Sequence, residues 1–311
     1  MLKGAYSHMN YFGKFLLLLT LVFSFLLFST LFGILVLVPF YGSGIINFLS
    51  SPDFSNPSTI NALKVMQIIN SVGGLLLPAV IYLWLCTLEN APPFRLANPV
   101  TSLSVLLSFI LIIIAQPFIG WANELNSYLS LPEWLSYVEQ WMKKAENQGE
   151  LVTEAFLSTT SVRGLIVNIF MIAILPAFAE EFLFRGALTT LLKDWSKSTH
   201  FAVFLSSFIF AAIHMQFYGF LPRFLLGMSL GYLFIWSGSL WLPIAAHFAN
   251  NFLSVIVEFL FRKGYMNTNA ENFGMENAAW FTVVSMIGVA GILYYIHNIT
   301  VRKEVKDHGP G

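Results

Sequence analysis

Residues 175–186 read Leu-Pro-Ala-Phe-Ala-Glu-Glu-Phe-Leu-Phe-Arg-Gly and lie inside a long apolar segment, about residues 164–192. A charged side chain near the centre of a bilayer costs about 2.5–3.5 kcal/mol, so charges in such a segment face protein or water. Glu181 and Arg185 lie one helical turn apart and can form an ion pair, whereas Glu180 points about 100° away. Pro176 has no N–H and leaves a helix carbonyl free. A buried ion pair joining two helices would explain Glu181 and Arg185 but leaves Glu180 uncompensated.

The rest of the chain is equally poor in charge. Of its 311 residues, 16 are Lys or Arg and 16 are Asp or Glu, so the formal net charge is zero. Charged residues make up 10% of the chain and hydrophobic residues 57%, against about 25% charged residues in soluble domains. This composition indicates a membrane-embedded protein, and without a basic excess it disfavours binding to nucleic acid. The single cysteine, Cys86, permits neither an internal disulfide nor a thiolate metal cluster.

Runs without charge predict an all-α fold, a polytopic membrane bundle of about eight transmembrane helices. A helix needs about 20 apolar residues to cross the hydrocarbon layer. Besides 164–192, the expected spans are 15–39, 67–88, 100–120, 200–220, 222–237, 240–261 and 279–298. The first is longer than the apolar region of a signal peptide, and we interpret it as a retained helix. Eight crossings put both termini on one side, and a small excess of Lys and Arg there favours cytoplasmic termini.

Polar side chains with helical spacing occur in two further apolar segments. His214 follows Phe210 by one turn, and alone it would more often be a satisfied core histidine. His247 and Asn251 share one helical face, a pattern that interhelical hydrogen bonding in membranes also uses. At about 1.5 Å per residue, Glu180, His214 and His247 lie roughly 18, 24 and 13 Å from the inner boundary, so helix tilt could bring them together. Together these groups would supply a base and hydrogen-bond donors for hydrolysis.

The three patterns in order resemble the motifs of the CAAX-protease and bacteriocin-processing (CPBP) family of intramembrane proteases, which includes the type II CAAX prenyl endopeptidases. The motifs are Glu180-Glu181…Arg185, Phe210…His214 and His247…Asn251. The resemblance covers about residues 160–260 and implies an eight-helix intramembrane endopeptidase whose site opens toward the cytosol and a lateral cleft. We therefore divide the chain into residues 1–160, with N-terminal helices, a CPBP-like catalytic core at 161–262, and a loop, last helix and tail at 263–311.

The resemblance also implies roles for the six polar residues. Glu180 would be the general base, and His214 would help to hold the attacking water. His247 and Asn251 would stabilise the oxyanion of the tetrahedral intermediate, with Glu181 and Arg185 supporting the arrangement. Glu180, His214 and His247 also make up the carboxylate and two histidines of a catalytic zinc site. Zinc is thus a cofactor alternative, and the metal-free mechanism is favoured.

A surface segment interrupts the apolar helices at residues 121–163. Within it, an apolar helical face is formed by Trp134, Leu135, Val138, Trp141, Met142 and Ala145. Pro132 and Glu133 can start this helix. Two tryptophans on that face are typical of a helix that lies at the membrane surface, although packing against the ends of the bundle fits equally well.

The expected partners are a membrane-associated peptide or protein, including lipid-modified and CAAX-like or leader peptides, and the membrane lipids of a bacterial plasma membrane. Two other classes of function use the same polar groups. Intramembrane Glu, His and Arg also occur in transporters and proton relays, but the two halves of this chain show no repeat. A non-catalytic scaffold or immunity factor could keep the site as a binding pocket. Haem ligation by His214 and His247 is a more remote alternative.

Overall fold

The computed structural model describes residues 2–88, 96, 100–128, 130–270, 273–274 and 279–308. Within these residues the regular elements are helices, without strands. Seven helices are long and apolar enough to cross a membrane, and an eighth apolar helix is shorter. This confirms the predicted all-α polytopic bundle, and the chain is an integral membrane protein.

The N-terminal part is a hairpin of two long helical segments. Its elements are α1 (Tyr11–Tyr41), η1 (Gly42–Gly44), α2 (Ile45–Ser50), α3 (Pro57–Asn70), η2 (Ser71–Leu76) and α4 (Leu77–Cys86). The second segment begins ten residues before the predicted span, because the Asn56 side chain accepts a hydrogen bond from the Ser58 N–H and Pro57 takes the first helical position. The segment η2 is π-helical.

The middle of the chain adds a further span and the surface helix. These elements are α5 (Ser102–Ser127), η3 (Glu133–Leu135) and α6 (Ser136–Leu157). The predicted amphipathic helix is therefore present, and Trp134, Val138 and Trp141 on its apolar face remain exposed. This surface is the one expected to meet the membrane interface.

One continuous helical segment of 35 residues, Val162–Ser196, carries the first motif. It consists of α7 (Val162–Asn168), η4 (Ile169–Ile174), α8 (Leu175–Glu181), η5 (Phe182–Thr189) and α9 (Thr190–Ser196). Both η4 and η5 are π-helical, so α8, with the two glutamates at its end, is flanked by wider turns. Such π-helical turns inside α-helices occur frequently at functional sites.

The remaining helices are α10 (Thr199–Ala212), α11 (Phe220–Ser237), α12 (Trp241–Arg262) and α13 (Ala279–His308). The predicted span 200–220 was wrong in its second half, because α10 has 14 residues and is only about 21 Å long, less than the hydrocarbon thickness. The chain turns at residues 213–219, where Met215 adopts a left-handed φ of 55°. His214 therefore lies in a loop and not inside a spanning helix.

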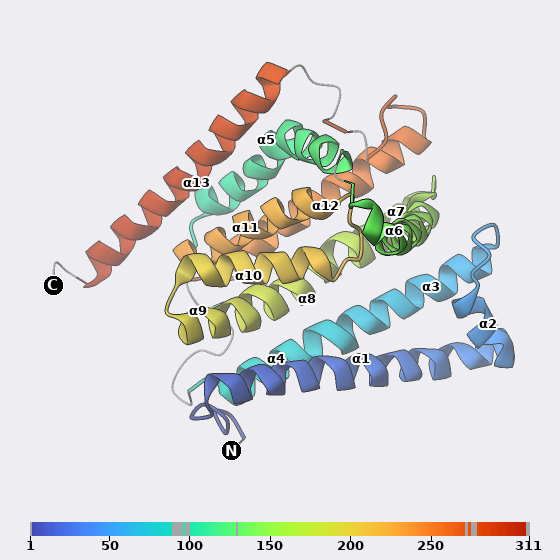
Figure 1. Cartoon of the computed structure of the whole chain (residues 1–311), viewed down its shortest axis with the longest axis horizontal. Helices are drawn as coiled ribbons and strands as arrows, with labels where there is room; N and C mark the ends of the chain where they lie inside the picture. Colours follow the sequence, from blue (N-terminus) through green and yellow to red (C-terminus); the bar gives the residue numbers. More distant parts are fainter. Residues whose placement is uncertain are drawn as a thin grey trace.

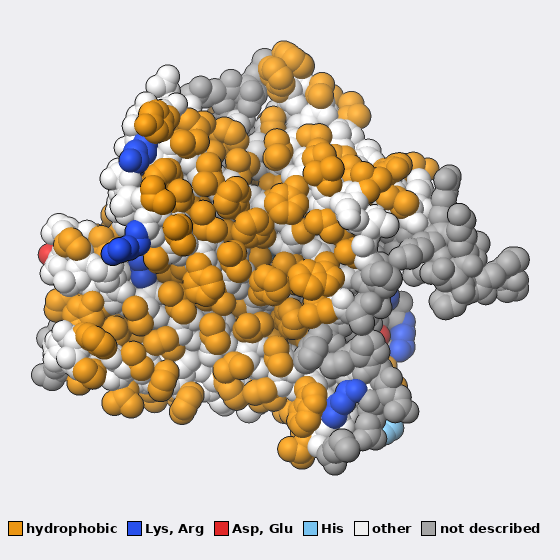
Figure 2. Space-filling model, turned by 180° about the vertical axis from the view of Figure 1, so that it is seen from behind, with side chains coloured by type: hydrophobic (Ala, Val, Ile, Leu, Met, Phe, Trp, Pro, Cys, Tyr) orange, Lys and Arg blue, Asp and Glu red, His pale blue; other side chains and the backbone are white. Residues whose placement is uncertain are grey.

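The helices form three neighbouring groups (Figure 1). The segment α3–α4 packs on α1, α10 packs on α11, and α5 packs on α13. The helix α12 contacts α5, α11, η4 and α8, so it joins the second and third groups. The start of α1 and the end of α13 lie on the same side of Figure 1. The face in Figure 2 is covered mainly by hydrophobic side chains with few charges, as a lipid-facing surface should be.

Candidate active site

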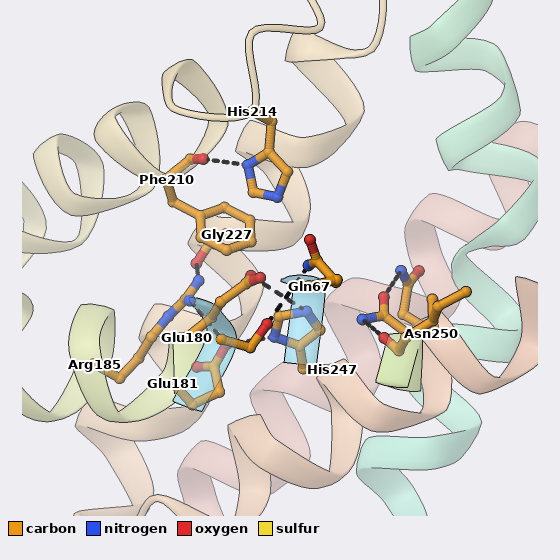
Figure 3. A network of polar contacts seen from close by, with 12 residues as sticks. Gln67, Glu180, Glu181, Arg185, Phe210, His214, Gly227, His247 and Asn250 are labelled. Carbon is orange, nitrogen blue, oxygen red and sulfur yellow. Dashed lines mark hydrogen bonds and ion pairs between the residues drawn. The ribbon is translucent and has the colours of Figure 1, made fainter. Parts of the chain in front are cut away.

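Glu181 and Arg185 form the ion pair that their sequence spacing predicted. The Nη1 atom of Arg185 donates to Oε1 of Glu181 at 2.8 Å, and the side chains are 1% and 0% exposed. The same Oε1 lies 2.7 Å from Nδ1 of His247 on α12. Because an ionised carboxylate paired with arginine can only accept, we assign the proton of this hydrogen bond to Nδ1 of His247. One buried carboxylate therefore orients two motif side chains (Figure 3).

The guanidinium of Arg185 also contacts a backbone carbonyl of α11 and an aromatic side chain of α10. Its Nη2 donates to the Gly227 carbonyl at 2.9 Å, and its guanidinium lies 4.8 Å from the centre of the Phe210 ring. A Cβ atom at Gly227 would meet Ser207 of α10 at 3.0 Å, so glycine permits the close approach of these two helices. Arg185 thus links three helical segments through one buried guanidinium.

Glu180 lies in a different environment from its neighbour. Its side chain is 16% exposed, and its Oε2 lies 3.8 Å from Nε2 of His247. Among the described residues, this Oε2 has no hydrogen-bond partner. This separation is longer than a hydrogen bond, so these two atoms are close neighbours without a direct hydrogen bond. Glu180 and His247 are therefore a pair of neighbouring side chains beside the buried ion pair.

His214 faces this pair from the loop after α10. Its Nδ1 lies 2.7 Å from the Phe210 carbonyl, which can only accept, so Nδ1 carries the proton and Nε2 has a free lone pair in the neutral ring. In Figure 3 this second nitrogen points into the space above Glu180 and His247. His214 also interacts electrostatically with Glu180 and His247. Its orientation suits a group that accepts a hydrogen bond from a water molecule.

The amide of Asn251 is anchored on the helix that carries the glutamates. Its Nδ2 donates to the Ile172 carbonyl at 3.0 Å, and its Oδ1 accepts from Nδ2 of Asn250 at 3.2 Å. Pro176, four residues after Ile172, has no N–H to donate to that carbonyl. The carbonyl that the proline leaves free thus accepts from Asn251, whose Nδ2 still has a second N–H.

Two contributors to the site were not among the candidate residues. Phe210 lies at its centre, with its ring 4.9 Å from that of His214 and 6.0 Å from that of His247. Gln67 on α3 is drawn beside Glu180 and His247 in Figure 3, and its Nε2 makes only a 3.5 Å hydrogen bond, to Ser71. An amide in the apolar run Val-Met-Gln-Ile-Ile at residues 65–69 was the signal that could have identified Gln67.

The zinc alternative was tested against the arrangement of these side chains. Among the described residues, no group of three or more His, Cys, Asp or Glu side chains could hold a metal ion. Glu180, His214 and His247 therefore do not fit a zinc site in this structure.

Comparison with known proteins identifies the segment that carries all six candidate residues. Residues 162–253 match the family described as type II CAAX prenyl endopeptidase Rce1-like. Because of this similarity, residues 162–253 are called the Rce1-like domain. Over 87 residues the chain is 36% identical to the uncharacterized protein YpbD of Bacillus subtilis (strain 168). That similarity covers 27% of this chain and 41% of the relative, and no solved structure matches the chain significantly.

The Rce1-like domain contains Glu180 and His247, the buried ion pair, His214 and Asn251, and the match confirms the predicted resemblance. It begins at the first residue of α7 and ends within α12. Gln67 and the surface helix α6 lie outside it. The division of the chain into 1–160, 161–262 and 263–311 stays a prediction.

Proposed function

We propose that this protein is an intramembrane endopeptidase that hydrolyses a peptide bond with a water molecule activated by Glu180 and His214. The observation that carries the proposal is the pair of adjacent glutamates with different environments. Each glutamate has an Oε2 without a hydrogen-bond partner among the described residues, but the Glu181 side chain is 0% exposed and its Oε1 is bound to Arg185 and His247, whereas the Glu180 side chain is 16% exposed. One glutamate thus builds the site, and the other is available for chemistry.

In the proposed reaction, Glu180 accepts a proton from the attacking water while Nε2 of His214 accepts a hydrogen bond from the same molecule. The hydroxide oxygen forms a bond to the scissile carbonyl carbon, and the carbonyl oxygen becomes an oxyanion. When the intermediate collapses, the C–N bond breaks and Glu180 returns its proton to the leaving amine. No net proton is gained or lost by the protein in one turnover.

His247 and Asn251 are proposed to stabilise the oxyanion. Hydrogen bonding to Glu181 fixes the ring of His247, so a proton on Nε2 would point to the same space as Glu180. Asn251 would contribute the N–H of Nδ2 that it does not donate to Ile172. Donors fixed before the reaction stabilise the developing charge without reorganisation, and removal of one such donor costs about 10²- to 10³-fold in rate.

The proposed substrates are membrane-associated peptides, including CAAX-like, leader and lipid-modified peptides, and the proposed location is a bacterial plasma membrane with cytoplasmic termini. A site inside an apolar bundle is reached most easily by a substrate that is already bound to the membrane. The similarity to a Bacillus subtilis protein supports a bacterial membrane. Cysteine-labelling of each terminus in intact cells would test the orientation.

The test compares Glu180→Gln and His214→Ala with the native protein in proteoliposomes. The probes are a farnesylated peptide that ends in Cys-aliphatic-aliphatic-X and the same peptide without the farnesyl group. Glutamine keeps the size of glutamate but cannot take the proton of water, so we expect at least a 10²-fold loss of kcat for Glu180→Gln, within the range of about 10²- to 10⁴-fold for general-base catalysis. His214→Ala should reduce kcat similarly.

Matched controls come from residues away from the site. Glu124→Gln and His200→Ala change exposed side chains that bond to Tyr128 and Tyr232, and both should leave kcat unchanged. Peptide cleavage at the native rate by Glu180→Gln or His214→Ala would contradict the proposed roles. Ion flux through the native protein without any peptidase activity would favour the transporter alternative.

A further inference from the structure

The loop at residues 213–219, between α10 and α11, determines where His214 lies. Met215 has a left-handed backbone with φ 55°, which is unfavourable for a residue with a side chain. Within the loop, the Gln216 side chain accepts a hydrogen bond from Arg223. A loop with such a backbone keeps one conformation only when contacts from its surroundings hold it.

Those contacts come from α5 and α6, which lie outside the Rce1-like domain. Asn126 at the end of α5 donates to the Phe217 carbonyl at 2.6 Å and accepts from the Leu221 N–H at 3.2 Å. Glu146 in the middle of α6 accepts from the Tyr218 N–H at 2.8 Å. The rings of Trp141 and Phe217 also pack, with centres 5.8 Å apart. The surface helix thus contacts the loop directly after His214.

The burial of Glu146 is unusual for a charged residue on a surface helix. Its exposed fraction is 5%, whereas Lys143 and Asn147 on the same helix are exposed. Taking a carboxylate away from water is unfavourable unless hydrogen bonds or opposite charges compensate it. Glu146 has both, because it accepts from Tyr218 and interacts electrostatically with Arg223.

Arg223, in the first turn of α11, connects Glu146 to the reacting groups. The guanidinium of Arg223 interacts electrostatically with Glu146 and Glu150 on α6 and with Glu180 on α8. His214 interacts with the same arginine. The charge of Arg223 therefore acts both on the carboxylates of the surface helix and on the proposed base of the active site.

We propose that Glu146 is a positioning residue of the active site, which holds the His214 loop through Tyr218 and balances the charge of Arg223. This inference rests on the proposed peptidase function. It assigns to the surface helix α6 a part in catalysis in addition to the membrane contact predicted for it. Glu146 acts through the loop and Arg223 and does not itself touch the substrate.

Two substitutions separate the two interactions of Glu146. Glu146→Gln keeps an oxygen that can accept from Tyr218 but removes the charge opposite Arg223, whereas Glu146→Ala removes both. We expect kcat to fall about 3- to 10-fold for Glu146→Gln and about 10- to 100-fold for Glu146→Ala. The KM should change by less than about twofold, because uniform binding of the substrate is not affected. The matched controls are Glu133→Gln and Glu133→Ala, since Glu133 is exposed in the short turn that precedes α6.

Hydrogen exchange of the native protein and the variants in proteoliposomes gives a readout independent of activity. Glu146→Ala should exchange faster at residues 213–219 and unchanged at residues 175–192. A native kcat in Glu146→Ala, a change in KM alone, or faster exchange throughout the bundle would each overturn the inference. If the native protein cleaves no peptide, the proposed function fails, and the exchange experiment still decides whether Glu146 holds the loop.

Discussion

Two ion pairs in this protein have the same sequence spacing and nearly the same geometry. Glu181–Arg185 lies between α8 and η5, and Glu258–Arg262 lies at the end of α12, with nitrogen–oxygen distances of 2.8 and 2.7 Å. Their surroundings differ. The first pair is 0% and 1% exposed, whereas Arg262 is 30% exposed and also binds Glu154, which is 63% exposed.

Each ion pair also has a third partner, and the two third partners differ in kind. Glu181 binds the imidazole of His247, whose Nε2 lies 3.8 Å from Oε2 of Glu180. Glu258 instead accepts from the backbone N–H of Ala270 in the loop after α12. The same Glu-x-x-x-Arg spacing therefore positions His247 of the candidate site in the first pair and holds the loop after α12 in the second. Burial and the third partner, not the spacing, distinguish the two pairs.

The largest expected difference concerns the arginines. Arg185→Ala leaves Glu181 as a buried charge without its cation, which should lower the free energy of unfolding by about 3–5 kcal/mol. Arg262→Ala removes an interaction that water partly replaces, and the expected loss is about 0–1 kcal/mol. Thermal denaturation of both variants in the same detergent measures this difference. Equal losses would show that burial does not distinguish the pairs.

A smaller difference is expected for the glutamates. Glu181→Gln keeps an oxygen that can accept from His247 but removes the charge opposite Arg185, at a cost of about 1.5–3 kcal/mol for the charge-assisted hydrogen bonds. The kcat should fall as well, because a neutral amide oxygen accepts a weaker hydrogen bond than a carboxylate and fixes the ring of His247 less firmly beside Glu180. Glu258→Gln should leave kcat within about twofold of the native value. Peptidase assays beside denaturation curves test this, and a full native kcat in Glu181→Gln would contradict the role of Glu181.

Most of the fold could be predicted from the sequence, for a physical reason. Charged residues are excluded from the hydrocarbon layer, so runs without charge mark the spans, and seven candidate spans were found. The error at 200–220 has an equally physical cause. Residues 213–219 contain no charged side chain, so the hydropathy pattern does not indicate the turn. The turn also depends on hydrogen bonds with Asn126 and Glu146, which come from distant parts of the chain.

The candidate site could be predicted only in part. Helical spacing predicted that Glu181 and Arg185 would pair, because an i, i+4 contact is local. The contact of Glu181 with His247 joins residues 66 positions apart, and no local pattern specifies such a contact. The same holds for Gln67, which comes from another helix, and for Asn251, whose partner is a backbone carbonyl.

The interaction of Asn251 with Ile172 gives a prediction of smaller size. Asn251→Ala removes a neutral hydrogen bond and should lower the free energy of unfolding by about 0.5–1.5 kcal/mol. Pro176→Ala introduces an N–H that can donate to the Ile172 carbonyl, so the stability loss should shrink in the double variant. The loss of kcat should not shrink, because the proposed oxyanion role uses the other N–H of Asn251. A kcat rescued by Pro176→Ala would make Asn251 a purely structural residue.

The smallest expected effect is that of metal removal. A catalytic zinc needs about three protein ligands at about 2.0–2.3 Å, and the described residues do not provide such a group. Incubation of the native protein with 1,10-phenanthroline followed by dialysis should therefore change kcat by less than about twofold. The same treatment should change the kcat of Arg262→Ala by no more than that. Metal analysis of the purified protein, with the inactive Glu180→Gln beside it, is the control. Two results together would assign Glu180 to a metal and not to a water molecule. The first is a loss of activity on chelation that added zinc restores. The second is about one zinc per native chain and less zinc in Glu180→Gln.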